Sequence, residues 1–132
     1  MTKLNQVYKC NVCGNIVEMV HTGIGQLVCC GEPMQLMEEK DKEEGTEKHL
    51  PVVEKIDNNI KIKVGSVEHP MTTEHYIEWI EIIFNGKVGK KFLQPNEKPE
   101  VEFEFKNIPE NFEIRAYCNV HGLWKAGIDN KD

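Results

Sequence analysis

The sequence predicts an all-β protein in two parts, and three observations support this. From residue 60 onward, apolar and polar side chains alternate with a period of two, as in strands with one buried and one solvated face. Turn signals separate these runs, and no segment has a convincing helical pattern. Residues 1–37 instead hold four of the five cysteines and few large apolar side chains. A part this small usually needs a metal, disulfides or a partner subunit to fold.

The strands of the second part are predicted from alternation and turns. Alternation is clearest over residues 60–64, 101–105 and 112–118. Residues 57–59 and the pair 85–86 are hairpin-type turns, and 95–99 is a proline-bounded loop. Segment 76–84 fits a helix or a strand, and its isoleucines and aromatic residues favour a strand. About seven short strands in roughly 90 residues predict a β-sandwich of immunoglobulin-like type.

A run of charged residues separates the two parts. Residues 38–48 are almost all charged and include one glycine. Such a run is typical of a solvated linker, and its end is a candidate active loop. We therefore expect a small metal-binding domain over residues 1–37 and the β-sandwich over residues 38–132.

Composition limits the class of protein and its compartment. The 132 residues are 39% hydrophobic and 29% charged, a globular balance. The net charge of -6 argues against nucleic acid as a partner. The first six residues are polar, and no stretch is long enough to span a bilayer, so we expect no membrane partner and a cytoplasmic location. Cysteines in that compartment are more often metal ligands or catalytic groups than disulfides, and an odd count of five fits poorly with complete pairing.

The first candidate metal site is all sulfur. Cys10 and Cys13 form a chelating pair with two residues between them, and the adjacent Cys29 and Cys30 complete four thiolates. Such a set binds zinc or a single iron in tetrahedral geometry. Side chains of adjacent extended residues diverge, so the second pair must distort either the backbone or the tetrahedron. A zinc knuckle without a redox role and a disulfide between Cys29 and Cys30 are the alternatives. The spacing resembles that of desulforedoxin, a rubredoxin-like mononuclear iron protein, which favours iron.

The second candidate site is mostly nitrogen. Its members are His49, His69, His75, Cys118 and His121. Four imidazoles with one thiolate suit a redox-active transition metal. Each histidine alone is more often a surface or core residue, and a lone cysteine is usually an inert buried thiol. The interpretation therefore rests on the whole set, and the remaining histidine, His21, has no partner motif.

Three motifs identify a family resemblance. They read Glu47-Lys48-His49, His69-Pro70-x4-His75 and Cys118-Asn119-x-His121-Gly122-Leu123-Trp124. From Tyr8 to Trp124 the chain resembles desulfoferrodoxin, the two-iron form of superoxide reductase. The resemblance implies one iron on the four cysteines and a second iron in the sandwich domain. It places the four histidines in the equatorial plane of the second iron, Cys118 at the axial position, and Glu47 as a sixth ligand of the ferric form.

The resemblance also implies a reaction. Superoxide takes one electron from ferrous iron and two protons to give hydrogen peroxide, without release of O₂. Lys48 lies over the open face, where its charge attracts the anion and stabilises developing peroxide charge. That local charge dominates within a Debye length of about 8 Å, although the chain is acidic. Rubredoxin or a similar small carrier supplies the electron, and the chain forms a homodimer that detoxifies reactive oxygen.

Two alternatives belong to other classes. A copper electron-transfer protein also carries Cys-x2-His on a β-sandwich, but it usually needs an axial methionine, and the last methionine here is Met71. A zinc ribbon joined to a binding module explains the four cysteines but neither the Glu-Lys-His motif nor the Cys-x2-His motif. Metal analysis separates the three. Iron at both sites would favour the reductase, copper would favour the electron-transfer protein, and zinc alone would favour the zinc ribbon with a binding module.

Overall fold

The computed structural model describes residues 1–43 and 48–129, except for the side chains of 128 and 129. These residues form thirteen strands and no helix, so the described chain has no helix that could cross a membrane. The chain divides into two compact units, Met1–Glu38 and Glu39–Asp132.

The first unit is built from five very short strands. β1 (Val7–Lys9) lies between β2 (Ile16–Glu18) and β5 (Gln35–Leu36) in an antiparallel sheet. β3 (Val28–Cys29) and β4 (Glu32–Pro33) form a separate two-stranded hairpin. Val7 is the large aliphatic side chain of this unit that is buried, whereas Val20 and Ile24 are exposed. The apolar interior is therefore small, as expected for a unit that depends on another source of stability.

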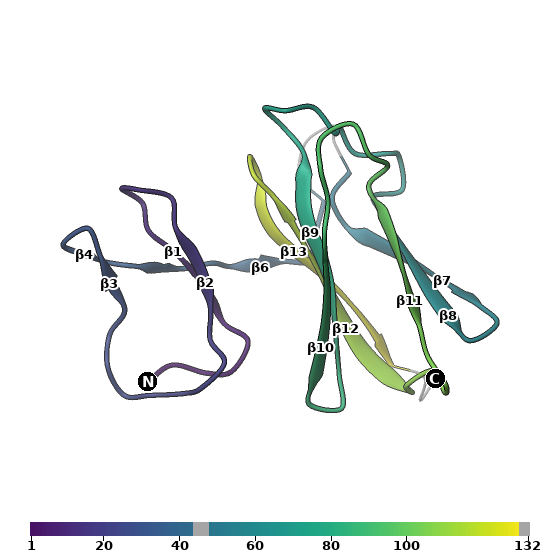
Figure 1. Ribbon diagram of the computed structural model, residues 1–132, viewed down its shortest axis with the longest axis horizontal. Helices are drawn as coiled ribbons and strands as arrows, with labels where there is room; N and C mark the ends of the chain where they lie inside the picture. Colours follow the sequence, from purple (N-terminus) through teal and green to yellow (C-terminus); the bar gives the residue numbers. More distant parts are fainter. Residues whose placement is uncertain (44–47, 130–132) are drawn as a thin grey trace. The chain divides into compact units, whose positions relative to one another are not determined.

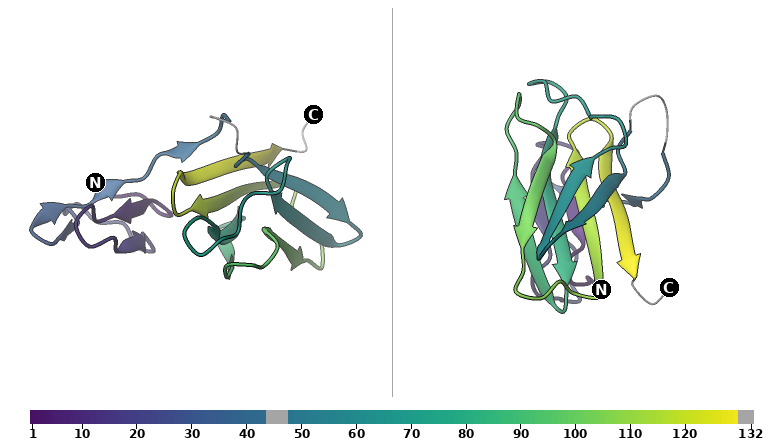
Figure 2. Two further views of the ribbon diagram at one scale, coloured as in Figure 1. Left: turned by 90° about the horizontal axis from the view of Figure 1, so that it is seen from above. Right: turned by 90° about the vertical axis from the view of Figure 1, so that its right-hand side faces the viewer.

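The second unit is a sandwich of two sheets (Figure 1). The larger sheet has the order β10-β9-β12-β13-β6 and the smaller one the order β11-β8-β7. Their strands are β6 (Glu39–Lys40), β7 (Pro51–Ile56), β8 (Asn59–Val64), β9 (Ile77–Phe84), β10 (Lys87–Phe92), β11 (Glu100–Glu104), β12 (Asn111–Cys118) and β13 (Gly122–Asp129). Paired strands are antiparallel except for β13 and β6. Figure 2 shows the same two sheets from two further directions.

The core of the sandwich lies between the sheets and follows the alternation in the sequence. Ile60, Ile62 and Val64 of β8 are buried, and so are Ile80 and Ile82 of β9. Side chains from both sheets belong to one hydrophobic cluster. The last core residue of β12 is Cys118, so the core ends at a candidate ligand.

The structure confirms the all-β fold class, and it refines one expectation. The strand predicted over 76–84 is β9, which covers residues 77–84, and Asn85 and Gly86 make the predicted turn after it with φ values of 46° and 72°, as a hairpin turn requires. The charge run is not entirely a linker, because Glu39 and Lys40 pair with Leu123 and Trp124 as an edge strand. Backbone hydrogen bonds to an open sheet edge outweigh the polar composition there.

Candidate metal centres

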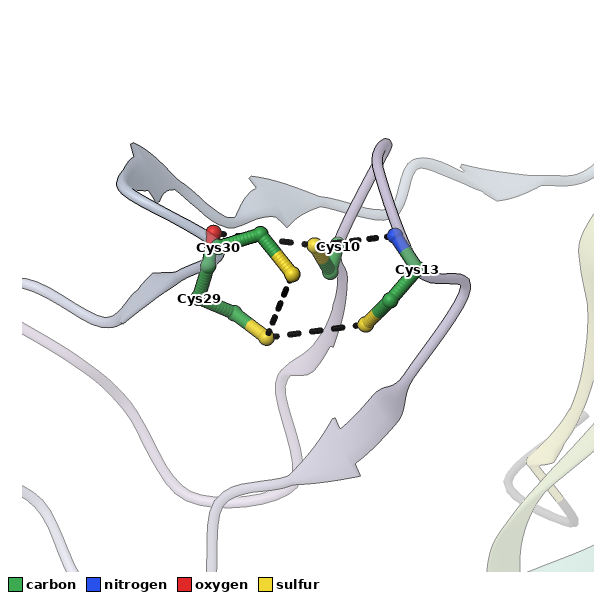
Figure 3. Close-up of side chains that lie close together, drawn as sticks. All are labelled: Cys10, Cys13, Cys29 and Cys30. Atoms are coloured by element: carbon green, nitrogen blue, oxygen red, sulfur yellow. Dashed lines mark hydrogen bonds between the residues drawn. The ribbon is translucent and has the colours of Figure 1, made fainter.

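Four cysteine side chains of the first unit point toward one another (Figure 3). Their sulfur atoms all lie within 4.8 Å of each other. The Cys13 and Cys29 sulfurs are 3.6 Å apart, and those of Cys29 and Cys30 are 4.0 Å apart. A tetrahedral ion with metal–sulfur bonds of about 2.3 Å has sulfur–sulfur edges of about 3.8 Å. The observed separations therefore fit a four-thiolate ion, and all four cysteines are free thiols rather than disulfides.

The backbone turns so that the adjacent cysteines can share one ion. Cys30 has a φ of 53° and Gly31 a φ of 75°, both in the left-handed region. This conformation costs energy in a residue other than glycine, and it turns the Cys30 side chain back toward the other three. The distortion expected for the Cys-Cys pair is thus taken up by the backbone.

Hydrogen bonds shift the pKa values of three of these thiols in different directions. The backbone N–H groups of Cys13 and Val12 lower the pKa of the Cys10 thiol to about 6. The neighbouring thiols of Cys13 and Cys10 raise the pKa of Cys30 to about 12, and they also raise that of Cys29. Thiolates crowded together repel one another, so a bound cation supplies the positive charge that lets all four ionise.

Four histidines of the second unit form a closed ring of imidazoles. Ring centroids are 4.7 Å apart for His49 and His69, 4.9 Å for His69 and His75, 5.1 Å for His75 and His121, and 4.8 Å for His121 and His49. Each neighbouring pair meets edge to face. The cycle has the order expected of four ligands around one central ion.

The single thiol lies beside this ring. Nitrogen atoms of His49, His75 and His121 lie within 4.8 Å of one another and of the Cys118 sulfur. His121 Nδ1 is 3.9 Å from that sulfur, and the His121 N–H donates to it at 3.4 Å. Cys118 ends β12 at a register shift, and Gly122, with φ of 89°, begins β13. The short turn between these strands brings the thiol and the imidazole together.

Two neighbours fix the orientation of the ring members. His69 Nδ1 lies 2.7 Å from the Pro70 carbonyl oxygen, which only accepts hydrogen bonds, so Nδ1 carries the proton and Nε2 is the nitrogen that would bind a metal. The His49 ring stacks on Trp124 with centroids 4.5 Å apart and planes 10° apart. Lys40 Nζ lies 5.3 Å from the Trp124 ring and donates to the His121 carbonyl at 3.1 Å. Contacts of this kind hold a histidine in place for a metal.

Asn119 is a further member of the site that sequence reasoning did not single out for a role. Its Oδ1 accepts the Tyr76 N–H at 2.9 Å, and its Nδ2 donates to the Glu74 carbonyl at 3.0 Å. His75 lies between these two residues, and its own N–H donates to Thr72 Oγ1 at 3.1 Å. Asn119 therefore clamps the segment that carries His75 against the turn that carries Cys118 and His121.

The structure brings the predicted ligands together in two groups. Cys10, Cys13, Cys29 and Cys30 form the first group. His49, His75, Cys118 and His121 form the second, and His69 joins it through its ring contacts. Lys48 is half-buried directly before His49, and Glu47 lies outside the described residues. His21 is exposed and belongs to neither group.

The donor atoms fit iron at both places. Four sulfurs in near-tetrahedral array suit a single iron, and four imidazoles with one thiolate suit a redox-active ion. Met71 does not supply the axial thioether of a copper site, because its sulfur accepts the Ile77 N–H at 3.4 Å and its side chain packs on the sandwich core. The two groups match the two iron sites expected from the family resemblance.

Both units of the chain are similar to known proteins. The desulfoferrodoxin family model matches residues 41–127, and the model of the desulfoferrodoxin N-terminal domain matches residues 2–37. A desulfoferrodoxin homolog from Archaeoglobus fulgidus is 58% identical over 96% of this chain and 100% of its own length. The desulfoferrodoxin of Nitratidesulfovibrio vulgaris is 54% identical over 92% of this chain and 94% of its own. The crystal structure of the superoxide reductase from Treponema pallidum matches with a TM-score of 0.74 and 30% identity, over 92% of this chain and 96% of that one. The chain thus belongs to the desulfoferrodoxin family.

Proposed function

We propose that this protein is a superoxide reductase, which converts superoxide, one electron and two protons into hydrogen peroxide. The observation that carries the proposal is the closed ring of four imidazoles beside the Cys118 thiol. The likeness to the Treponema pallidum superoxide reductase over nearly the whole chain supports it. An iron ion held by these five side chains supplies the one-electron chemistry.

The ring residues provide a charge environment suited to an anionic substrate. Imidazoles that bind a metal are neutral, and the proton of His69 is held on Nδ1 by the Pro70 carbonyl. Four neutral ligands and one thiolate leave a cationic centre positively charged. His49 and His69 are buried, at 1% and 2% exposure, so water screens this charge weakly. The site therefore attracts a small anion even though the chain has a net charge of -6.

Lys48 is assigned the second positive charge of the site. It is half-buried and directly precedes His49. Its ammonium group draws superoxide in and stabilises charge on the product. Glu47 is assigned the sixth ligand position of the oxidised site, so that it acts after the product has left. Both roles remain predictions from the family resemblance.

The remaining parts of the proposal concern the whole protein. Residues 1–37 form an auxiliary iron domain and residues 38–132 the reductase domain. A small carrier such as rubredoxin returns the electron, the protein acts as a homodimer, and it removes reactive oxygen in the cytoplasm. The assignment of all five cysteines as metal ligands, with none in a disulfide, supports a reducing compartment. The two family-model matches, which meet between residues 37 and 41, support the division.

Lys48→Ala tests the catalytic proposal. Without the ammonium group, the second-order rate of superoxide attack should fall about 10-fold, which corresponds to roughly 1.4 kcal/mol of barrier. The loss should shrink at high ionic strength, because salt screens the wild-type advantage. Pulse radiolysis measures the rate and its dependence on salt.

Metal analysis and the visible spectrum of the same samples should show iron at both sites. Equal, salt-independent rates for the two proteins would contradict the role of Lys48, and a protein that holds only zinc or copper would contradict the reductase.

A further inference from the structure

Two contacts hold the backbone of Lys48 and His49 in place, one at Gly65 and one at Glu43. We propose that Gly65 and Glu43 are positioning residues, which set where the Lys48 ammonium group lies and so control its effect on superoxide. This inference rests on the proposed function. It adds two residues, neither of them a ligand, that act through Lys48.

The backbone of Lys48 packs closely against Gly65. A Cβ atom at residue 65 would lie 2.6 Å from both the carbonyl carbon and the oxygen of Lys48, and 2.8 Å from its Cβ. Ordinary contact begins at 3.4 Å, so a side chain there would push the Lys48 backbone away by about 0.8 Å. Among the glycines that the structure describes, the other close approach is at Gly89, where the neighbours are side chains. A backbone neighbour cannot rotate away, and the whole segment has to move.

The backbone at Gly65 is held in place through its neighbour Val64. Gly65 directly follows β8, whose last residue, Val64, is 1% exposed. The Val64 N–H donates to the Pro99 carbonyl at 2.9 Å, and the His69 N–H donates to the Val64 carbonyl at 3.0 Å. Gly65 therefore follows a core residue, and that core residue is hydrogen-bonded to the ligand His69. A substitution at residue 65 should displace the backbone of Lys48 rather than the backbone of residues 64 and 65.

Glu43 holds the same segment through hydrogen bonds to its side chain. One carboxylate oxygen, Oε1, accepts the His49 N–H at 2.9 Å and the Leu50 N–H at 3.3 Å. Hydrogen bonds to an ionised acceptor are stronger than neutral ones. The carboxylate thus fixes the two residues that follow Lys48, while Gly65 fixes Lys48 itself.

Position matters here because lysine has a long, flexible side chain. Four rotatable bonds separate its charge from the backbone, so the place that the charge reaches depends on where the backbone is held. Charge–anion attraction varies with distance, and misplacing a catalytic group by about 1 Å can cost as much as ~100-fold in rate. A displacement of about 0.8 Å at Lys48 should therefore change the attack rate by several-fold.

A double-mutant cycle tests the role of Gly65. Gly65→Ala is made in the wild-type and Lys48→Ala backgrounds of the iron-loaded protein. The rate of superoxide attack is measured by pulse radiolysis at low and high salt. We expect Gly65→Ala to slow attack about 3-fold or more at low salt, and to have no further effect once Lys48 is alanine. The matched control is Gly89→Ala, which presses on Phe103 and Ile82 in the core. It should leave the salt dependence of the rate unchanged. An equal loss from Gly65→Ala in both backgrounds would overturn the inference.

A pair of substitutions isolates the hydrogen bonds of Glu43 from its charge. Glu43→Gln and Glu43→Ala remove the same negative charge, but only glutamine keeps an acceptor oxygen. Hydrogen exchange, followed by mass spectrometry on the iron-loaded protein, reports the amides of residues 49 and 50. We expect exchange there to quicken about 10-fold or more in Glu43→Ala, and to stay near wild type in Glu43→Gln. The attack rate should follow the same order. If exchange in Glu43→Ala is as slow as in wild type, Glu43 does not hold the backbone of residues 49 and 50.

Different results would contradict the role of Lys48 and the roles of its two positioning residues. If Lys48→Ala attacks superoxide as fast as wild type, the proposed role of Lys48 fails and this inference fails with it. If Lys48→Ala is slow but Gly65→Ala and Glu43→Ala both retain the wild-type rate, only the positioning inference fails. Glu54→Gln, which removes an exposed carboxylate paired with Lys63 at 3.6 Å, is the control for loss of charge elsewhere in the same unit.

Discussion

The two candidate metal centres are assembled in opposite ways. The cysteine centre uses two short turns of a unit with little apolar core, and its ligands span residues 10 to 30. The histidine centre collects ligands from residues 49 to 121, and each is held by a strand end or a loop of the sandwich. In the first unit the metal would stabilise the fold. In the second, the core of the sandwich and the hydrogen bonds of Asn119 hold the segments that carry the ligands, so we expect the protein to prearrange this centre.

The largest effect should come from Cys118, a ligand that also belongs to the core of the sandwich. Cys118 is fully buried and belongs to the hydrophobic cluster of the sandwich. Cys118→Ser replaces a thiolate by a hydroxyl that stays protonated, so the histidine centre should lose its iron and superoxide reduction should fall by more than about 100-fold. Iron analysis with the visible spectrum should still show the four-cysteine iron. Loss of both irons would mean that the two centres are not independent.

The contrast between the centres also explains what the sequence could predict. Cys10, Cys13, Cys29 and Cys30 lie within 21 positions, so their spacing alone indicates a shared ion. Strands β8, β11 and β12 were predicted from alternation, and β9 from its isoleucines and aromatic residues. The order of the histidine ring was not, because it depends on how the turn after Cys118 meets the loop that carries His75. Gly65 has no local signal either, since its close approach to Lys48 exists only in the folded sandwich.

Asn119 should have the next largest effect, and it tests whether the sandwich prearranges its ligands. Asn119→Ala removes the two side-chain hydrogen bonds that hold residues 74 and 76. Metal affinity at the histidine centre should fall about 10- to 100-fold, and the unfolding free energy by about 1–3 kcal/mol. Titration with a competing chelator measures the affinity, and denaturant unfolding the stability. The control, Asn107→Ala, changes an exposed asparagine of the same unit. Unchanged affinity in Asn119→Ala would show that the metal, rather than the protein, orders His75.

The smallest effect concerns a carboxyl group of the sandwich that lies in neither metal group. Partial burial, then the neighbouring Glu39, raise the pKa of Glu113 from 4.5 to about 6. The folded state therefore favours the protonated form, and this contribution is present below pH 4.5 and lost as the pH rises through 6. Glu113→Gln should raise the melting temperature by about 1–2 °C at pH 7.5 and leave it unchanged at pH 4.

Calorimetry at the two pH values measures this difference. Glu102→Gln, at an exposed position of β11, is the control. The iron content of both centres should stay at the wild-type level in Glu113→Gln. A stabilisation that is equal at both pH values would contradict the assignment of the effect to the Glu113 carboxyl.

The central claim is that the histidine centre carries out the reaction and the cysteine centre is auxiliary. Cys13→Ser tests this most directly, because it removes one of the four thiolates of the first unit and none of the ligands of the histidine centre. The measurement is the superoxide-attack rate of this variant, with its iron content determined on the same sample. We expect loss of the four-cysteine iron, retention of the second iron, and a rate close to that of wild type. A variant that keeps its second iron but no longer reacts with superoxide would contradict it.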